Sequence, residues 1–119
     1  MKKSDVLRGK SKAFALRIIN LYKYLCKQKS EYVLSKQVLR SGTSIGANIS
    51  EGGYAQSKAD FVSKLTIALK EIVETEYWLE LLYESEYIDN SSFQSISADC
   101  SELLKLLTSS IKTAKSNLK

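Results

Sequence analysis

Two glycines spaced four residues apart, Gly42 and Gly46, lie within a segment that has the period of an α-helix. Apolar residues fall on one stripe of that helix, at Leu34, Val38, Ile45 and Ile49. A glycine inside a helix costs about 1 kcal/mol relative to alanine, so two of them need a compensating gain. Small side chains at Ser41 and Ser50 extend the trimmed face. We therefore predict that another helix lies close against this one, with the closest approach at the glycines.

Apolar periodicity and turn signals predict four helices within one domain that spans residues 1–119. We expect the helices at about residues 4–28, 34–52, 58–84 and 92–117. Gly52 is a typical signal for the end of the second helix, and Ser57 is a good N-cap for the third. Ser91 with Gln94 has the pattern of a capping box for the fourth. Because the connections are short, the predicted fold class is all-α, an antiparallel up-down-up-down four-helix bundle.

The predicted third helix is apolar on two sides. One stripe consists of Phe61, Leu65, Ala68, Ile72, Leu79 and Leu82. The other consists of Val62, Leu69, Val73 and Tyr77. A helix with two apolar faces needs more partners than one neighbour supplies, so we expect either a central position or a subunit interface. In the fourth helix, the predicted buried stripe extends from Phe93 to Leu118.

Charge is distributed unevenly along the chain, whose formal net charge is +5. Residues 1–40 have a net charge of +9, residues 41–90 of −6, and residues 91–119 of +2. Four basic residues project from the polar side of the first helix: Arg8, Lys12, Lys23 and Lys27. They are either a solvated helix face or an electrostatic footprint for the phosphates of RNA or DNA. No base-reading motif is present, so such binding would be largely independent of sequence.

Several kinds of chemistry lack the residues that they require. The chain has no histidine, which removes the usual base for a serine or cysteine nucleophile and the ligands of a di-iron bundle. We expect the glutamates of the third helix to form salt links to Arg40, to the first helix or to another subunit. Cys26 and Cys100 match no metal spacing and are expected as free thiols. No apolar run reaches the roughly 20 residues that span a bilayer. We expect a cytoplasmic protein that is not an enzyme and has no metal, cofactor or membrane partner.

The second and third helices also carry a family motif. The run from Gln37 to Gly52, with its core Ser-Ile-Gly-Ala-Asn-Ile-Ser-Glu-Gly, resembles the four-helix bundle proteins of the 23S rRNA intervening-sequence family. The segments Ser57–Phe61 and Leu65–Leu79 continue the match. The resemblance implies a ring-like homopentamer with no established activity. It also extends to accessory proteins of diversity-generating retroelements, which are pentamers that bind nucleic acid and a reverse transcriptase.

The motif marks a set of positions that we interpret as structural or interface residues. They are Arg40, Gly42, Ser44, Gly46, Asn48, Glu51, Gly52, Glu74 and Glu76. Two functional hypotheses follow. The first is an oligomeric scaffold, made by the chain with itself, that binds RNA or DNA through its basic surface. The second is a structural scaffold or protein adaptor without nucleic-acid binding, in which the basic helix pairs with acidic helices of neighbouring subunits or of a partner protein.

Overall fold

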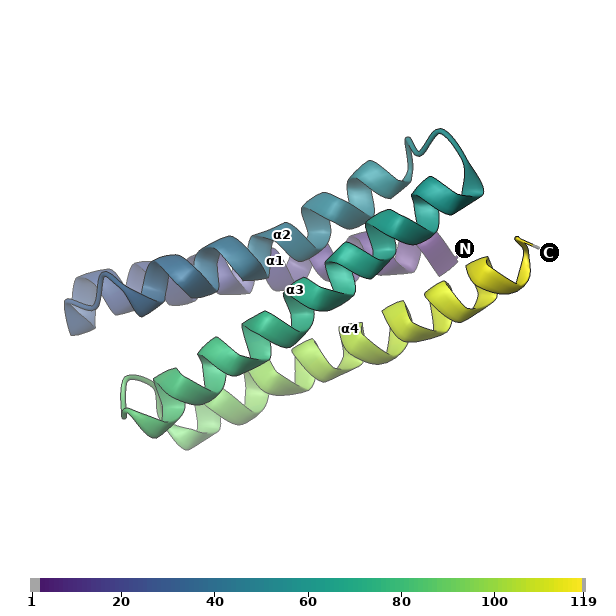
Figure 1. Ribbon diagram of the computed structural model, residues 1–119. Coiled ribbons are helices and arrows are strands. Elements are labelled where there is room, and N and C mark those ends of the chain that lie inside the picture. Colours follow the sequence, from purple (N-terminus) through teal and green to yellow (C-terminus); the bar gives the residue numbers. More distant parts are fainter. Residues whose placement is uncertain (1–2, 119) are drawn as a thin grey trace.

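The computed structural model describes residues 3–118, which form four long helices joined by short turns (Figure 1). The helices are α1 (Lys3–Lys29), α2 (Leu34–Gly52), α3 (Lys58–Glu84) and α4 (Asn90–Ser116). No strand occurs within this part of the chain. The predicted all-α fold class is confirmed.

The helices form an antiparallel bundle in which each one contacts only its two neighbours. Contacts join α1 to α2, α2 to α3, α3 to α4, and α4 back to α1, so α1 and α3 are diagonal, as are α2 and α4. In Figure 1, α1 and α3 run in one direction, and α2 and α4 return in the other. The bundle is elongated, with extents of 49 × 23 × 22 Å. This is the up-down-up-down arrangement expected for short connections.

The core lies along the bundle axis because each helix contributes an apolar stripe. Its largest fully buried side chains include Phe14, Ile18, Leu25, Ile45, Leu65, Ile72, Leu79, Leu82, Leu103 and Leu107. Burying side chains of this size stabilises a fold by about 1.5–3 kcal/mol each. The predicted stripe of α4 was wrong at its end: Leu118 lies beyond the last helical residue and is 48% exposed.

Polar side chains set where the helices begin. Ser57 caps α3 as predicted, since its Oγ accepts from the backbone N–H of Asp60 at 3.1 Å. The predicted start of α4 was wrong. That helix begins at Asn90, and its N-cap is Asp89, whose Oδ1 accepts from the N–H of Ser92 at 2.7 Å. A carboxylate is a stronger acceptor than the predicted Ser91 hydroxyl, and it also complements the positive end of the helix dipole.

The start of α2 is capped from outside the helix by Glu31, which lies in the connection predicted between the first two helices. The Glu31 carboxylate accepts from the backbone N–H groups of Val33, Leu34 and Ser35 at 3.2, 3.1 and 2.7 Å. Only 8% of Glu31 is exposed. A helix N-terminus leaves several N–H groups unsatisfied, and one buried carboxylate here satisfies three of them.

Gly42 and Gly46 of α2 face another helix, as predicted, and that helix is α1. A Cβ atom built on Gly42 would lie 2.7 Å from Cγ1 of Ile18, which is too close for any real side chain. At Gly46 the nearest atoms belong to Ser11, with its Oγ 3.4 Å away and its backbone O 3.5 Å away. The two helices can therefore approach each other closely only because residue 42 has no side chain.

Candidate functional site

The four basic residues selected from the sequence all lie on the exposed surface of α1. They are Arg8, Lys12, Lys23 and Lys27. Within residues 3–118, none of them takes part in an ion pair. Two other cations of α1 are neutralised by α4. Lys10 Nζ lies 3.3 Å from Glu102 Oε1, and Arg17 Nη1 lies 2.7 Å from Asp99 Oδ2. The uncompensated positive charge of α1 is thus on the side turned away from α4.

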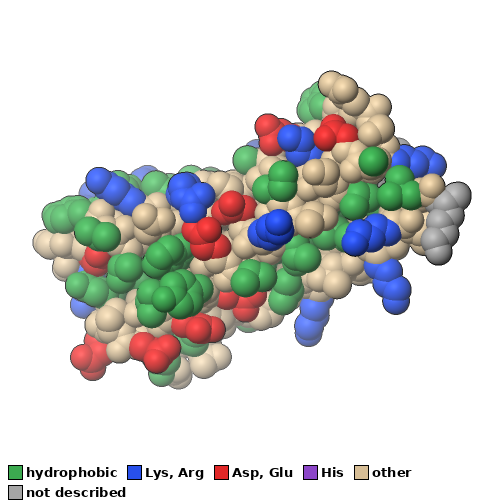
Figure 2. Space-filling model, in the orientation of Figure 1, with side chains coloured by type: hydrophobic (Ala, Val, Ile, Leu, Met, Phe, Trp, Pro, Cys, Tyr) green, Lys and Arg blue, Asp and Glu red, His purple; other side chains and the backbone are tan. Residues whose placement is uncertain are grey.

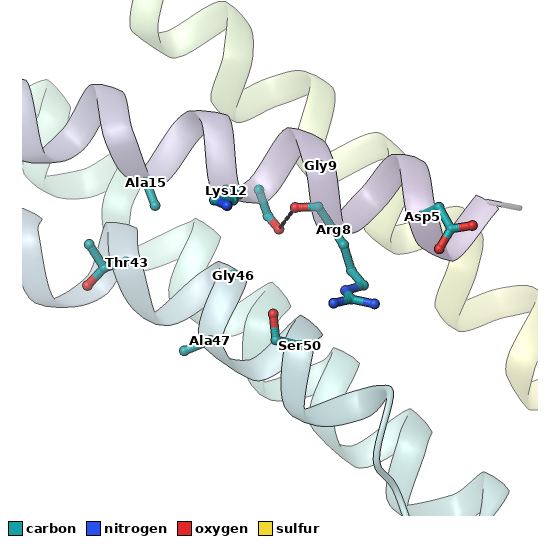
Figure 3. Close-up of a pocket in the computed structure, with 10 residues that line it drawn as sticks. Asp5, Arg8, Gly9, Lys12, Ala15, Thr43, Gly46, Ala47 and Ser50 are labelled. Carbon is teal, nitrogen blue, oxygen red and sulfur yellow. Dashed lines mark hydrogen bonds between the residues drawn. The ribbon is translucent and has the colours of Figure 1, made fainter. Parts of the chain in front are cut away.

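Arg8 and Lys12 line a groove between α1 and α2 that has a volume of about 400 Å³. Gly46, Ala47 and Ser50 form its α2 side. In Figure 3 the side chain of Arg8 extends from α1 across this groove toward α2. The groove exists because the side chains of α2 are small here. It offers two cations, with Asp5 also in its lining, and Lys23 and Lys27 lie farther along the helix.

A polar cluster of four residues joins α2 to α3: Arg40, Glu71, Glu74 and Trp78. Arg40 forms a hydrogen-bonded ion pair with Glu74, as the sequence predicted for the glutamates of α3. Trp78 Nε1 donates to the same Glu74 oxygen at 3.0 Å. Glu71 Oε2 lies 3.9 Å from Arg40 Nη1, close enough for attraction but too far for a hydrogen bond, and this buried oxygen has no hydrogen-bond partner. Burial, followed by the neighbouring Glu74 charge, raises the pKa of Glu71, and Arg40 opposes that shift.

Beneath the charged cluster lies a buried pair of hydroxyls. Ser41 and Thr75 are fully buried, and their side-chain oxygens are 2.9 Å apart in a hydrogen bond. Thr75 Oγ1 also lies 2.7 Å from the Glu71 carbonyl oxygen, one turn earlier in α3. The sequence interpretation missed this pair. Its signal was a polar residue on the buried stripe, because Thr75 falls at helical spacing between Ile72 and Leu79.

The remaining motif residues of α2 do not converge on a common point. Ser44 Oγ donates to a carbonyl one turn earlier at 2.6 Å, and Asn48 Nδ2 donates to the carbonyl of Ser44 at 2.9 Å. Both bonds stay within the helix. Glu51 is exposed near the end of α2, whereas Gly52 is buried against Phe61 of α3. These positions shape α2 and its contacts, and they do not assemble a reactive centre.

Two further titratable side chains, Cys100 and Glu76, have raised pKa values. Burial, with the nearby carboxylates of Glu76 and Asp99, raises the pKa of Cys100 to about 12, so its thiolate does not form near neutral pH. Glu76 is half-buried on α3, and burial together with Glu80 raises its pKa. Within the described residues, both cysteines are free, and no three acidic or cysteine side chains gather where they could hold a metal ion. None of the four helices is long and apolar enough to cross a bilayer.

The outward face of α3 carries apolar side chains that are exposed at the surface of the subunit. Val73 is 58% exposed, Tyr77 54% and Ile67 40%. Val62, which the sequence placed on the same face, is buried, and Leu69 is half-buried. Figure 2 shows hydrophobic side chains gathered over the half of α3 nearer to its turn with α4, with acidic side chains around them. The two-sided apolar pattern of the sequence therefore corresponds to one face in the core and one face at the surface.

The fold and these surfaces define an antiparallel four-helix bundle protein. The chain belongs to the 23S rRNA-intervening sequence protein family, whose sequence model matches residues 3–109. A crystal structure of a protein of unknown function from the S23 ribosomal protein family of Bacteroides thetaiotaomicron has 58% sequence identity and a TM-score of 0.92. That match covers 93% of this chain and 99% of the other. No curated protein matches this chain in sequence. The family inferred from the motif is confirmed.

Proposed function

We propose that this protein is a non-enzymatic homo-oligomer of five copies that binds RNA or DNA in the cytoplasm through α1. The observation that carries this proposal is the set of exposed, unpaired cations on α1. Arg8 and Lys12 are the best-placed members because they flank the groove of about 400 Å³ between α1 and α2. A phosphate backbone could follow this groove without any base being read.

Binding of this kind is electrostatic and depends steeply on salt. Each phosphate that a lysine or arginine neutralises releases condensed counterions, and the logarithm of the affinity falls by about 0.7–0.9 per contact for each tenfold rise in salt. One subunit offers few contacts, so its affinity alone would be low. Several linked copies raise the overall affinity through effective concentration, without any new kind of contact.

The outward face of α3 supports the oligomer. Val73 and Tyr77 are each more than half exposed and lie one helical turn apart. Contiguous apolar surface of this kind typically marks an interaction site. The number five comes from the family resemblance, which includes pentameric accessory proteins of diversity-generating retroelements. Those proteins also bind a reverse transcriptase, which makes a partner protein part of the proposal.

The nucleic-acid part is tested by reversing charge at the groove. We expect R8E/K12E to weaken binding to a labelled single-stranded or duplex RNA or DNA at least tenfold at 50 mM salt. The slope of log affinity against log salt should also become shallower by roughly 1.5–2 for each subunit in contact, because two phosphate contacts are lost. The matched control is K112E/K115E, which makes the same charge change at exposed positions of α4. The control should bind nearly as well as the wild type.

Two results would overturn this part of the proposal. One is an absence of wild-type binding to every such probe at 50 mM salt, which would favour the adaptor hypothesis. The other is an equal loss in R8E/K12E and in the control, which would show that only net charge matters. The assembly part is tested separately by the native mass of the wild type in solution. A mass near 13.4 kDa, that of one chain, would overturn it.

A further inference from the structure

Helices α1 and α3 each present a continuous strip of residues that faces outward from the subunit. The α1 strip consists of Gly9, Ala13, Leu16, Asn20, Lys23 and Lys27. The α3 strip consists of Thr66, Lys70, Val73, Tyr77, Glu80 and Glu84. All of these residues are exposed except Thr66, which is half-buried. The two helices are diagonal in the bundle, so the strips lie on different sides of the molecule.

The two strips have the same spacing and complementary chemistry. Each advances by 4, 3, 4, 3 and 4 residues, which is the alternation that keeps two parallel helices in register along a shared seam. When the strips are aligned from their first residues, the small Gly9 faces Thr66. In the same alignment, the small Ala13 faces the long side chain of Lys70.

The alignment also pairs the apolar and charged members of the strips. Leu16 faces Val73, and these two side chains are 55% and 58% exposed in the isolated subunit. At the far end, Lys23 faces Glu80. The last pair in the register, Lys27 and Glu84, again joins a cation to an anion.

The charged ends of both strips are unsatisfied within one subunit. Lys23 and Lys27 are four residues apart on one helix face, and Glu80 and Glu84 repeat that spacing with the opposite charge. Like charges at this spacing are mutually destabilising. None of the four residues forms an ion pair within residues 3–118. Opposite charge on a neighbouring copy would relieve this repulsion.

Gly9 gives an independent indication of an external contact. A Cβ atom built there would have no heavy atom within 4 Å, so nothing inside the subunit requires glycine at this position. Glycine in an exposed helix interior costs about 1 kcal/mol relative to alanine. Close approach by a helix of another molecule would compensate for that cost, as Ile18 does at Gly42 within the subunit.

We propose that the α3 strip of one copy packs in parallel and in register against the α1 strip of the next copy, with Lys23 and Lys27 paired to the neighbouring copy's Glu80 and Glu84. The inference rests on the proposed oligomer and names its interface. It also divides the cations of α1. Lys23 and Lys27 serve assembly, and Arg8 and Lys12 remain for phosphate.

This contact would be heterologous, because two different surfaces meet. A parallel two-fold pairing of α3 with α3 would place Glu80 and Glu84 next to their own copies, which is electrostatically unfavourable. Within a subunit, α1 and α3 run in the same direction (Figure 1). Rotation about an axis parallel to the bundle preserves that direction, so successive copies can join by parallel α1–α3 contacts and close into a ring.

The test is a charge swap measured by native mass spectrometry and light scattering at a fixed protein concentration. We expect E80K/E84K and K23E/K27E each to weaken association at least tenfold. The quadruple variant E80K/E84K/K23E/K27E carries the net charge of the wild type with both signs exchanged across the contact. It should recover the wild-type mass. K112E/K115E makes the same charge change as K23E/K27E outside the strips and should leave the mass unchanged, and circular dichroism checks that every variant is folded.

The outcomes separate this inference from the proposed function. A monomeric wild type overturns the oligomer, and the interface with it. An assembled wild type whose two double variants also stay assembled overturns the interface alone. The interface is also overturned if both double variants dissociate and the quadruple variant does not reassemble. The charges would then affect association without pairing with each other. Nucleic-acid binding gives a further check, since the assembled quadruple variant should keep salt-dependent binding that R8E/K12E loses.

Discussion

The two sides of α2 pack against their neighbouring helices in different ways. On the side that faces α1, the helix has glycine in place of a larger residue, and Ile18 of α1 fills the space at Gly42. Toward α3, it keeps polar side chains and pairs them, with the Ser41 and Thr75 hydroxyls buried beneath the ion pair of Arg40 and Glu74. The first contact depends on shape alone. The second depends on hydrogen-bond partners supplied by another helix.

The difference matters for how each contact fails. A packed apolar contact is disrupted by added volume, because interiors are close-packed and cannot absorb even one methyl group freely. A polar contact is disrupted by removing one partner, because the other is then left buried without a hydrogen bond. Substitutions on the two sides of α2 should therefore act through opposite changes, added bulk on one side and lost polarity on the other.

The largest effect is expected at Gly42. The Cβ of alanine would lie 2.7 and 2.8 Å from the two γ-carbons of Ile18, which is fully buried and cannot swing away. We expect G42A to lower the free energy of unfolding by roughly 1–3 kcal/mol, even though alanine is the better helix former. Urea unfolding at a fixed protein concentration measures this change.

Gly46 provides the matched control, one turn along the same face. A Cβ there would meet Ser11 at 3.4 Å or more, close to an ordinary contact distance. We expect G46A to be neutral, or stabilising by up to about 1 kcal/mol through helix propensity. A G46A variant that loses as much stability as G42A would show that the two glycines are equally close to α1, contrary to the asymmetry seen here.

Sequence patterns predicted the α1 side of α2 well for a physical reason. Glycine in a helix is costly, so a glycine there predicts close approach by another helix, as found at Gly42. The α3 side was harder to foresee. A serine at position 41 and a threonine at position 75 are ordinary helix residues, and only the register of the two helices brings their oxygens within 2.9 Å. The capping of α2 by Glu31 was equally hard to foresee, because it depends on the path of the turn between α1 and α2.

The second prediction removes one member of the buried hydroxyl pair. T75V keeps the shape of the side chain but leaves the Ser41 hydroxyl with only a 3.5 Å contact to the Val38 carbonyl. We expect a loss of about 1–2 kcal/mol, the cost of a buried polar group without a good partner. S41A should cost less, because Thr75 keeps the carbonyl of Glu71 at 2.7 Å.

A double-mutant cycle separates the pair from its surroundings. If the two hydroxyls stabilise each other, S41A/T75V should lose less stability than the two single variants combined, by at least about 0.5 kcal/mol. Strict additivity of the two changes would mean that the hydroxyls act independently and that the close contact between them contributes nothing.

The third prediction concerns the carboxylate that the α2–α3 contact leaves incompletely satisfied. Burial raises the pKa of Glu71 above its ordinary value of 4.5, so its proton is held more tightly in the folded state. Its contribution to stability is therefore full below pH 4.5 and is lost as the pH rises through the folded pKa. The glutamine in E71Q is neutral at every pH and therefore keeps this contribution. We expect E71Q to be more stable than the wild type at pH 7, with the difference in stability shrinking toward pH 4.

Glu74 is the control on the same helix. Its carboxylate accepts from Arg40 and from Trp78 Nε1, so E74Q should lower stability at pH 7 where E71Q raises it. Thermal unfolding of both variants between pH 4 and pH 8 distinguishes them. If E71Q were less stable than the wild type at pH 7, the attraction across 3.9 Å to Arg40 would outweigh the cost of burying the charge.

For the candidate site, as for the fold, some features could be predicted from the sequence and others could not. The cations of α1 were identified from sequence because charge and helical period suffice to place them on a surface. Which of them are free could not be read from sequence, because it depends on α4. Lys10 and Arg17 have the same charge and lie on the same helix as Lys12, yet both are paired with acids far along the chain.

The smallest effect is expected at the exposed ion pair between Arg17 of α1 and Asp99 of α4. Arg17 donates to Asp99 and to the side chain and carbonyl of Ser95, with distances of 2.7 to 3.3 Å. Both charged side chains remain about half exposed, at 40% and 46%, so solvent screens their attraction. We expect D99N to cost about 0.2–1 kcal/mol in low salt and less in 0.5 M salt. If D99N lost as much stability as G42A, or if salt did not reduce the loss, the ion pair would not be weak and screened by solvent. It would then contribute as much to stability as the close-packed contact at Gly42.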